Sequence, residues 1–149
     1  MTFESREDTS LILRLRDARL RLKEARVEVG LPASAPARSR WLLALHERGA
    51  PAAGIPPRPV IGPALADPGV RQAMAGALEE ACQAAGQGNA EGVEAGLSKC
   101  GQAGADGIRA YIDRGISPGN APSVIARKGF DKPLVETGAL YASFTYEVK

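Results

Sequence analysis

Apolar residues recur at steps of three and four positions through the second half of the chain, in two consecutive runs. Asp67 and Pro68 open the first run with a capping side chain and a proline at the first helical position, which is typical of a helix start. Residues 86–88 end this run, and Asn89 is placed to cap the second. The spacing therefore predicts a helix pair over 67–114. The apolar positions of the pair are Val70, Met74, Leu78, Ala81, Ala85, Val93, Leu97, Cys100, Gly104, Ile108, Tyr111 and Ile112.

A weaker helical pattern occupies the N-terminal residues, 1–26, where the stretch 11–26 reads LILRLRDARLRLKEAR. A period-2 pattern also runs through the leucines, but it loses register at Asp17 and Ala18, so a helix is favoured. The valines of 27–30 then predict a short strand that ends in a turn. The apolar stripe of the helix comprises Leu11, Leu15, Ala18, Leu22 and Ala25.

Two stretches rich in proline and glycine separate the remaining elements. Residues 49–63 hold five prolines, and proline fixes φ and removes a backbone donor. We therefore expect a long, stiff, extended loop there, neither helix nor central strand. Residues 115–133 form a second irregular stretch with one helical turn, which Ser123 is placed to cap.

The end of the chain, 137–149, predicts a short helix capped by Thr137 and then a strand, because apolar and polar residues alternate over 144–148. With the other strand at 27–30, the sequence predicts one α+β domain over 1–149. Its parts are a small mixed or antiparallel sheet, two long helices, an N-terminal helix and a long proline-rich loop.

Composition narrows the possible classes of protein. A chain of 149 residues, 44% hydrophobic and 24% charged, can bury a core. The net charge of +2 is too small to indicate a nucleic-acid binder. No apolar run approaches the roughly 20 residues needed to span a bilayer, and the polar, acidic N-terminus is unlike a signal peptide. We therefore expect no membrane partner and a protein made in the cytoplasm.

The candidate reactive residues form no recognisable constellation. His46 is the only histidine, and beside Glu47 it is a candidate half of an acid–base pair, but no nucleophile accompanies it. In an antiparallel helix pair, Cys82 and Cys100 are offset by about 10 Å, which is too far for a disulfide. They are predicted to be buried free thiols. No phosphate loop or metal-ligand cluster is visible, so we expect no catalytic site, cofactor or metal, and no enzyme.

The N-terminal helix is rich in basic residues, which raises an alternative function as a small DNA-associated protein. DNA contact needs a one-sided basic face. Here the charges spread around the helix and are partly balanced by Asp17, Glu24 and Glu28, so a solvated or salt-bridged face is favoured. The residues that would face DNA or a partner are Arg14, Arg16, Arg19 and Arg21.

Three segments, in order, resemble those of one family. Residues 46–51 and 54–59 are similar to its "HEFGAP…GIPPRPF" pattern. Two positions depart from it: Arg48, and Val60 directly after Pro59, stand where aromatics are usual. Residues 121–129 are similar to its "APST…KG" stretch, and 132–146 to its "KPLIDTGQLxxSITY" ending. The family comprises tail-completion and neck proteins of tailed bacteriophages.

The resemblance implies a structural virion protein, made in the host bacterium, that forms a ring at the head–tail neck or tail end. Connector, head-closure and tail-terminator roles all stay open. The implied partners are copies of the chain in sixfold or multiple symmetry, other neck, portal-side or tail-tube proteins, and packaged DNA without sequence preference. For Arg58, a local salt bridge and an intersubunit contact are both open. The implied interface or structural residues are His46, Glu47, Gly49, Pro51, Ile55, Pro56, Arg58, Pro59, Lys132, Pro133, Leu134, Thr137, Gly138 and Leu140.

Overall fold

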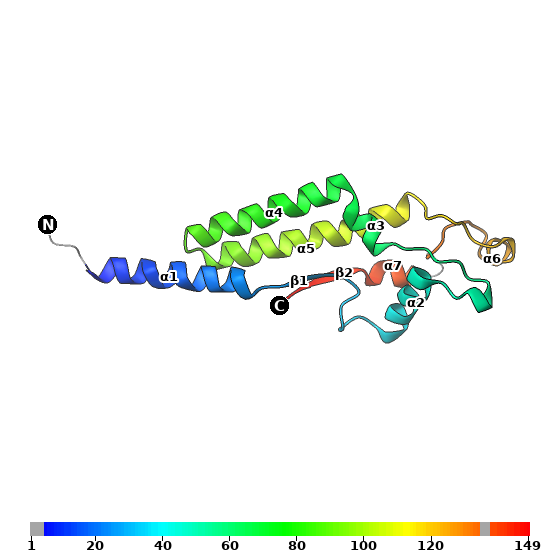
Figure 1. The fold of residues 1–149 in the computed structure, drawn as a ribbon, viewed down its shortest axis with the longest axis horizontal. Coiled ribbons are helices and arrows are strands. Elements are labelled where there is room, and N and C mark those ends of the chain that lie inside the picture. Colours follow the sequence, from blue (N-terminus) through cyan, green and yellow to red (C-terminus); the bar gives the residue numbers. More distant parts are fainter. Residues whose placement is uncertain (1–4, 135–137) are drawn as a thin grey trace.

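Two long antiparallel helices, α4 (Pro68–Gly86) and α5 (Ala90–Asp113), form the body of this elongated molecule (Figure 1). The structure is a computed structural model that describes residues 5–134 and 138–149. Asp67 Oδ1 accepts the N–H of Gly69 at 2.9 Å and caps α4. Asn89 Oδ1 accepts the N–H of Gly92 at 2.9 Å and caps α5. The predicted helix pair and both predicted caps are confirmed.

The two helices approach closely because small residues face each other. A Cβ added at Gly96 would lie 2.7 Å from both the Cβ and the backbone N of Ala81. The residues of α4 that are buried here are alanines at positions 77, 81, 84 and 85. The prediction for Leu78 is therefore wrong: its side chain is 41% exposed, since the alanine face, not the leucine, turns toward the glycines of α5.

The cysteine predictions are partly confirmed. Cys82 and Cys100 are both free thiols, as expected. Cys100 is buried in α5, whereas Cys82 is exposed on α4. The prediction of burial is wrong for Cys82 because it follows Ala81 directly, and adjacent helical positions do not share a face.

The two strands pair with each other, although most of the chain separates them. β1 (Val27–Gly30) and β2 (Thr145–Val148) form an antiparallel sheet, with Val27 opposite Val148. Two backbone hydrogen bonds between Arg26 and Lys149, of 2.7 and 2.9 Å, extend it. The sheet packs on α5, where a Cβ at Gly101 would overlap the ring of Tyr146. Both predicted strands, and with them the α+β fold, are confirmed.

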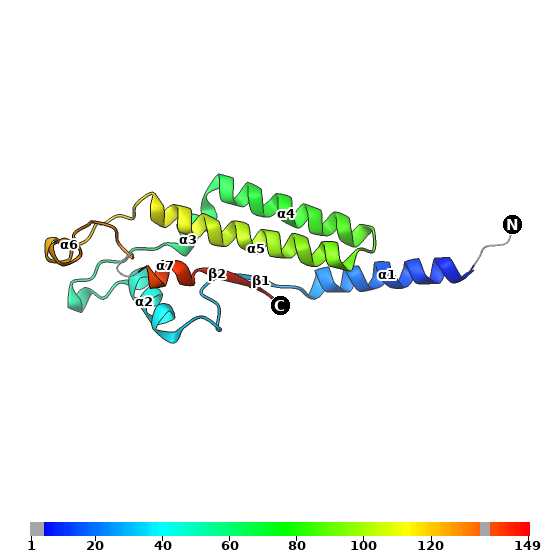
Figure 2. The same cartoon turned by 180° about the vertical axis from the view of Figure 1, so that it is seen from behind.

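Helix α1 (Ser5–Glu24) precedes the sheet and projects beyond the turn between α4 and α5 (Figures 1 and 2). It ends two residues before the predicted boundary. Only Ala18 of its predicted apolar stripe is fully buried. Leu11, although part of the predicted stripe, is 43% exposed. It precedes Arg14 and Leu15, where α1 lies against the turn at Gly88: a Cβ on Gly88 would lie 3.1 Å from the backbone N of Leu15 and 3.2 Å from the Cβ of Arg14.

Five short helical segments fill the opposite end of the molecule. The prediction of a wholly extended loop over 49–63 is wrong, because one segment is a 3-10 turn that begins with a proline and another includes Pro63. Both prolines stand in a first turn, where no N–H donor is needed. The segments are α2 (Ala37–Arg48), η1 (Pro51–Ala53), α3 (Ile61–Ala66), α6 (Pro122–Lys128) and α7 (Ala139–Ser143).

The two short-helix caps predicted near the C-terminus have different outcomes. Ser123 does not cap α6: the N-cap is Ala121, which makes no side-chain hydrogen bond. Thr137 lies outside the described residues. The N-cap of α7 is Gly138, whose φ of 76° is left-handed.

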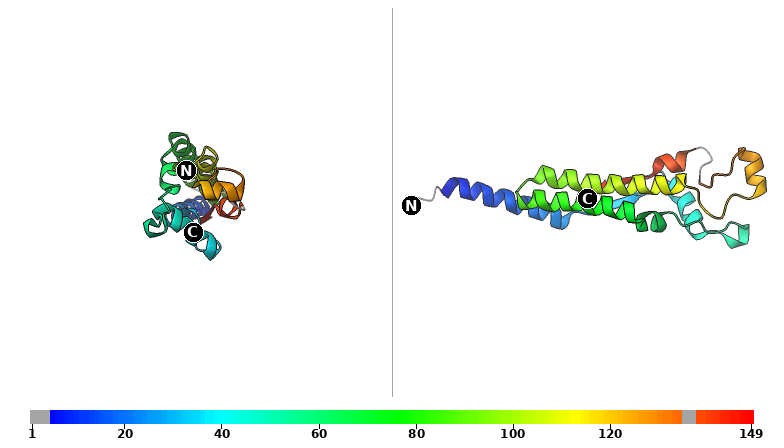
Figure 3. Two further views of the ribbon diagram at one scale, coloured as in Figure 1. Left: turned by 90° about the vertical axis from the view of Figure 1, so that its right-hand side faces the viewer. Right: turned by 90° about the horizontal axis from the view of Figure 1, so that it is seen from above.

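Two clusters of buried side chains stabilise the two ends of the molecule. The long axis that runs from one end to the other is seen end-on and from above in Figure 3. One cluster joins α1 to the alanine face of α4 and to α5. The other joins α2, α3, α5 and α7 at the opposite end. The second cluster comprises Leu43, Val60, Ala64, Ile108, Ile112, Ile116, Leu134, Leu140 and Phe144.

Candidate functional site

A cleft of about 870 Å³ lies at the end of the molecule formed by α2, α6 and the start of α7. Residues from all three family-like segments line it, although they come from distant parts of the sequence. His46 and Arg58 belong to the first segment, Lys128 to the second, and Leu134 and Leu140 to the third. The structure therefore brings seven of the fourteen predicted interface residues to the lining of one cleft.

Glu47 holds two elements together beside this cleft. Its Oε1 accepts the backbone N–H of Val60 at 2.8 Å and that of Ile61 at 2.9 Å. These amides begin α3, whose own N-cap residue provides no side-chain hydrogen bond. A carboxylate at a helix N-terminus satisfies free N–H groups and interacts favourably with the helix dipole. Glu47 is thus a capping residue supplied by another helix.

The loop after α2 folds back on itself. Ala50 and Ile55 exchange two backbone hydrogen bonds, of 2.8 and 3.1 Å, and Arg58 donates its backbone N–H to the carbonyl of His46 at 2.6 Å. Gly49 makes the reversal possible, with a φ of 70° and no room for a Cβ, which would lie 2.7 Å from the N of Pro57. The glycine and prolines of the family-like motif build this turn.

Arg58 is buried, with 6% of its surface exposed. Its Nε donates to the carbonyl of Pro118 and its Nη2 to that of Gly119, both at 2.7 Å. The intersubunit contact of Arg58 stays a prediction. Arg58 forms no salt bridge within the described residues, so the predicted local salt bridge is not found there. Arg58 instead ties the first family-like segment to the loop that leads into the second.

His46 is half-buried in the wall of the cleft. Burial lowers its pKa, and the positive charges of Arg58 and Lys128 lower that pKa further. Its Nδ1 is buried without a hydrogen-bond partner among the described residues, as is the Nδ2 of Asn120. The Oε1 of Glu47 is directed to the backbone amides of Val60 and Ile61, and no hydrogen bond among the described residues joins Glu47 to His46.

The third family-like segment also packs inward. Lys132 Nζ donates to Asp113 Oδ1 at 2.7 Å, and the hydroxyl of Tyr141 donates to Asp113 Oδ2 at 2.7 Å. These two hydrogen bonds, that of Lys132 first, lower the pKa of Asp113. Leu134 is buried despite a left-handed φ of 66°, which indicates that packing holds its backbone in place. Pro133, Leu134 and Leu140 are buried, and Ile55 and Pro56 half-buried, whereas Pro51 and Pro59 are exposed.

The arginines of α1 lie far from this cleft, at the other end of the molecule (Figure 1). Arg14, Arg16 and Arg19 are exposed. Arg21 pairs with Asp17 at 3.2 Å and also with Glu94 of α5. The structure therefore separates the two sets of predicted site residues.

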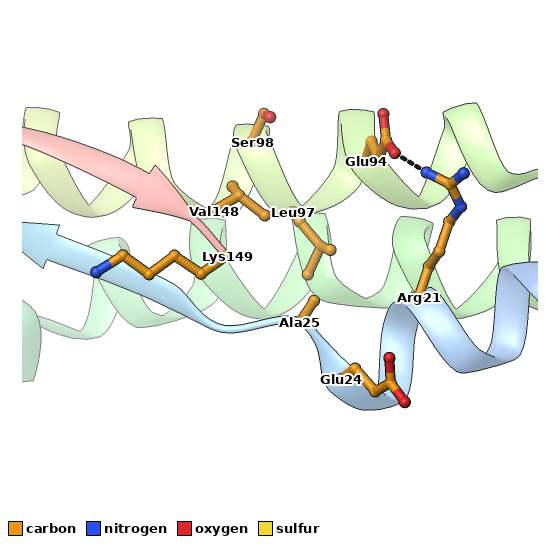
Figure 4. Close-up of a pocket in the computed structure, with 8 residues that line it drawn as sticks. All are labelled: Arg21, Glu24, Ala25, Glu94, Leu97, Ser98, Val148 and Lys149. Carbon is orange, nitrogen blue, oxygen red and sulfur yellow. Dashed lines mark hydrogen bonds and ion pairs between the residues drawn. The ribbon is translucent and has the colours of Figure 1, made fainter.

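A second hollow, of about 440 Å³, lies between the end of α1, α5 and the end of β2 (Figure 4). Its charged side chains are largely paired with each other or with their neighbours. Arg21 reaches Glu94 across the hollow, and Lys149 pairs with Glu28 at 2.6 Å and Glu147 at 3.4 Å. The hollow presents no excess of one charge, so the cleft at the other end is the better candidate for a binding site.

Sequence reasoning missed the long-range roles of Glu47 and Arg58, although it selected both residues through the resemblance. Among the described residues, no group of three His, Cys, Asp or Glu side chains could hold a metal ion. Within those residues there is also no helix of sufficient length and apolarity to cross a membrane. No protein-family model matches the chain, and neither a curated protein nor a solved structure matches it significantly. The resemblance to phage neck proteins therefore stays a prediction.

Proposed function

We propose that this protein is a structural subunit of a tailed-phage virion that assembles into a ring at the neck or tail end. The observation that carries the proposal is the convergence of the three family-like segments around one cleft at one end of the molecule. A surface built jointly by distant segments has a fixed shape. A closed ring of identical subunits requires two different surfaces of fixed shape that are complementary to each other.

The chemistry of these segments supports a structural role over a catalytic one. Glu47 and Arg58 are engaged with backbone groups, and Lys132 with a carboxylate. A catalytic site would instead place a nucleophile and its base within hydrogen-bond reach of each other. The family-like residues hold the shape of this end, which is the role that the resemblance implies.

The alternative is a DNA-associated protein that uses α1. The exposure of Arg14, Arg16 and Arg19 favours it. The pairing of Arg21 with Asp17 and Glu94 counts against it, because those carboxylates reduce the positive potential of the helix.

The test is the mass and shape of the purified protein, measured by light scattering and negative-stain microscopy with and without neighbouring virion proteins. We expect rings with a central hole. A monomer under every condition, with DNA affinity that falls steeply with salt, would overturn the proposal in favour of the alternative. Reversing the charge of Arg14, Arg19 and Arg21 separates the two. Loss of a DNA affinity with assembly unchanged would count against the ring proposal in its simple form, whereas rings that persist when the unmodified chain has no DNA affinity to lose would support it.

A further inference from the structure

Helix α1 exposes aliphatic side chains on the side that it turns away from the body. Leu13 is 57% and Leu20 41% exposed, and Ile12 is 62% exposed beside them. Ala18, which is buried against α4 and α5, lies about 140–160° around the helix from both leucines. Leu13 and Leu20, the leucine seam, are seven positions apart and therefore share one side of the helix. Exposed aliphatic residues that form a patch indicate a surface that a partner covers.

The two flanks of the leucine seam carry opposite charges. Arg16 and Lys23 each follow a seam leucine by three positions and lie on one flank, with Arg19 beside them. Asp17 and Glu24 each follow a seam leucine by four positions and lie on the other flank. The helix thus presents an aliphatic line between a basic flank and an acidic flank.

The charges of the flanks differ in how far they are already paired within the chain. Asp17 is engaged with Arg21 at 3.2 Å. Arg16, Lys23 and Glu24 are exposed and form no ion pair within the described residues. Figure 4 shows Glu24 pointing away from Arg21 and from α5. Glu24 is therefore the free carboxylate of the acidic flank, and the basic flank has free cations at the same level.

A second copy of α1 supplies what both flanks need. In a parallel pair of helices the basic flank of each meets the acidic flank of the other, as e and g positions do in parallel coiled coils. Lys23 and Glu24 differ in height by about 1.5 Å along the helix, so they meet without a shift of register. In an antiparallel pair each flank would meet its own kind and be repelled.

DNA is the other candidate partner for this surface, but it fits only the basic flank. Affinity for the phosphate backbone comes from cations that replace its counterions. A phosphate backbone would repel Glu24 and would leave the leucine seam uncovered. The combination of an aliphatic line with charges of both signs therefore favours a second copy of the helix.

We propose that α1 of one copy packs parallel and in register against α1 of a neighbouring copy through the leucine seam. Exposed ion pairs add little affinity, so the aliphatic contact supplies the attraction and the charged flanks set the direction. Parallel helices place all the bodies at one end of the assembly, which agrees with a ring whose axis runs along α1. This inference rests on the proposed ring and names one contact between its subunits.

The first test removes the leucine seam in the full chain. Leu13→Gln with Leu20→Gln should weaken self-association at least about tenfold, measured by sedimentation velocity across protein concentrations. The matched control, Leu78→Gln, replaces a leucine of α4 that is also 41% exposed and should associate as the unmodified chain does. Circular dichroism establishes that each variant is folded. Unchanged association of the folded seam variant would overturn the inference.

The second test examines the direction of the helices. Lys23→Glu places glutamates on both flanks at one level, and Glu24→Lys places lysines there, so each variant alone should associate about three- to tenfold more weakly. An equimolar mixture of the two restores opposite charges across a parallel contact and should regain association. The chain with both exchanges should associate as the unmodified chain does. A mixture that stays dissociated would overturn the parallel contact.

The outcomes also separate this contact from the proposed function. Rings that the seam variant forms as readily as the unmodified chain, alone or with neighbouring virion proteins, would leave the neck function standing and remove the contact. Pairs of chains that depend on the seam and never close into rings would support the contact and argue against the ring. A monomer whose affinity for a DNA duplex falls on Arg16→Glu would overturn both.

Discussion

The carboxylate of Glu47 and the backbone amide of Val60 are separated by 13 positions in the sequence and joined by a hydrogen bond of 2.8 Å. This bond fixes the end of α2 to the start of α3. Between them lies the folded-back loop that forms one wall of the cleft.

Glu47→Ala should lower the free energy of unfolding by about 1–3 kcal/mol, because it leaves two amides at the start of α3 without a partner. Glu47→Gln keeps an acceptor oxygen and should cost less. Denaturant unfolding with an unchanged m-value measures the difference. Glu79→Gln, at an exposed position of α4, is the control and should stay within about 0.5 kcal/mol of the unmodified chain. Equal stability of Glu47→Ala and the unmodified chain would contradict this role.

Two glycines of the helix pair should respond to alanine in opposite directions. Gly96→Ala places a methyl group against the backbone of Ala81 and should destabilise by about 1–3 kcal/mol. Gly76→Ala meets open space and should stabilise by about 0.5–1 kcal/mol through helix propensity. Thermal unfolding of both variants checks the close approach of α4 and α5. A stabilised Gly96→Ala protein would show that the helices lie further apart.

Arg58→Lys should destabilise the protein although it keeps the charge, because an ammonium group lacks the planar fork that reaches the carbonyls of Pro118 and Gly119 together. The expected loss is about 2 kcal/mol. Hydrogen exchange should become faster in the 117–120 loop and stay unchanged in α4. Arg71→Lys, at an exposed site, controls for the loss of a guanidinium; if exchange rises equally in both variants, Arg58 does not hold the loop.

Stability should fall through His46 as the pH drops below the ordinary pKa of 6.5. Its pKa in the folded protein lies below the ordinary 6.5, chiefly through burial. The unfolded chain therefore binds a proton that the folded chain resists. The contribution is complete above pH 6.5 and is lost as the pH falls toward the folded-state pKa. His46→Gln should flatten this part of the profile of unfolding free energy against pH. A profile with the same slope in the variant would exclude His46 as its source.

The parts of the fold that sequence predicted correctly depend on local signals. Asp67 with Pro68, and Asn89 after 86–88, mark helix boundaries within one turn, and alternation marks the strands. Leu78 was wrongly placed because two faces of α4 have apolar residues. Only the glycines of a distant helix decide which face is buried.

The sequence indicated which residues belong to the site, but it did not indicate which groups their side chains contact. The resemblance selected Glu47 and Arg58, yet the partners of Arg58 lie 60 and 61 positions away, and no periodicity encodes such a pair. The loop over 49–63 was predicted as extended because its prolines were counted without their positions in turns. Pro51 starts a 3-10 turn and Pro63 lies in the first turn of α3, where proline is well tolerated.

The pairing of β1 with β2 has a consequence for the order of folding. Val27 is synthesised long before its partner Val148. The sheet therefore cannot form until β2 has been made, and such a non-local pairing slows folding. In that interval α4 and α5 can already pack as a local hairpin. The strand β1 then waits for β2, and their pairing completes this part of the fold.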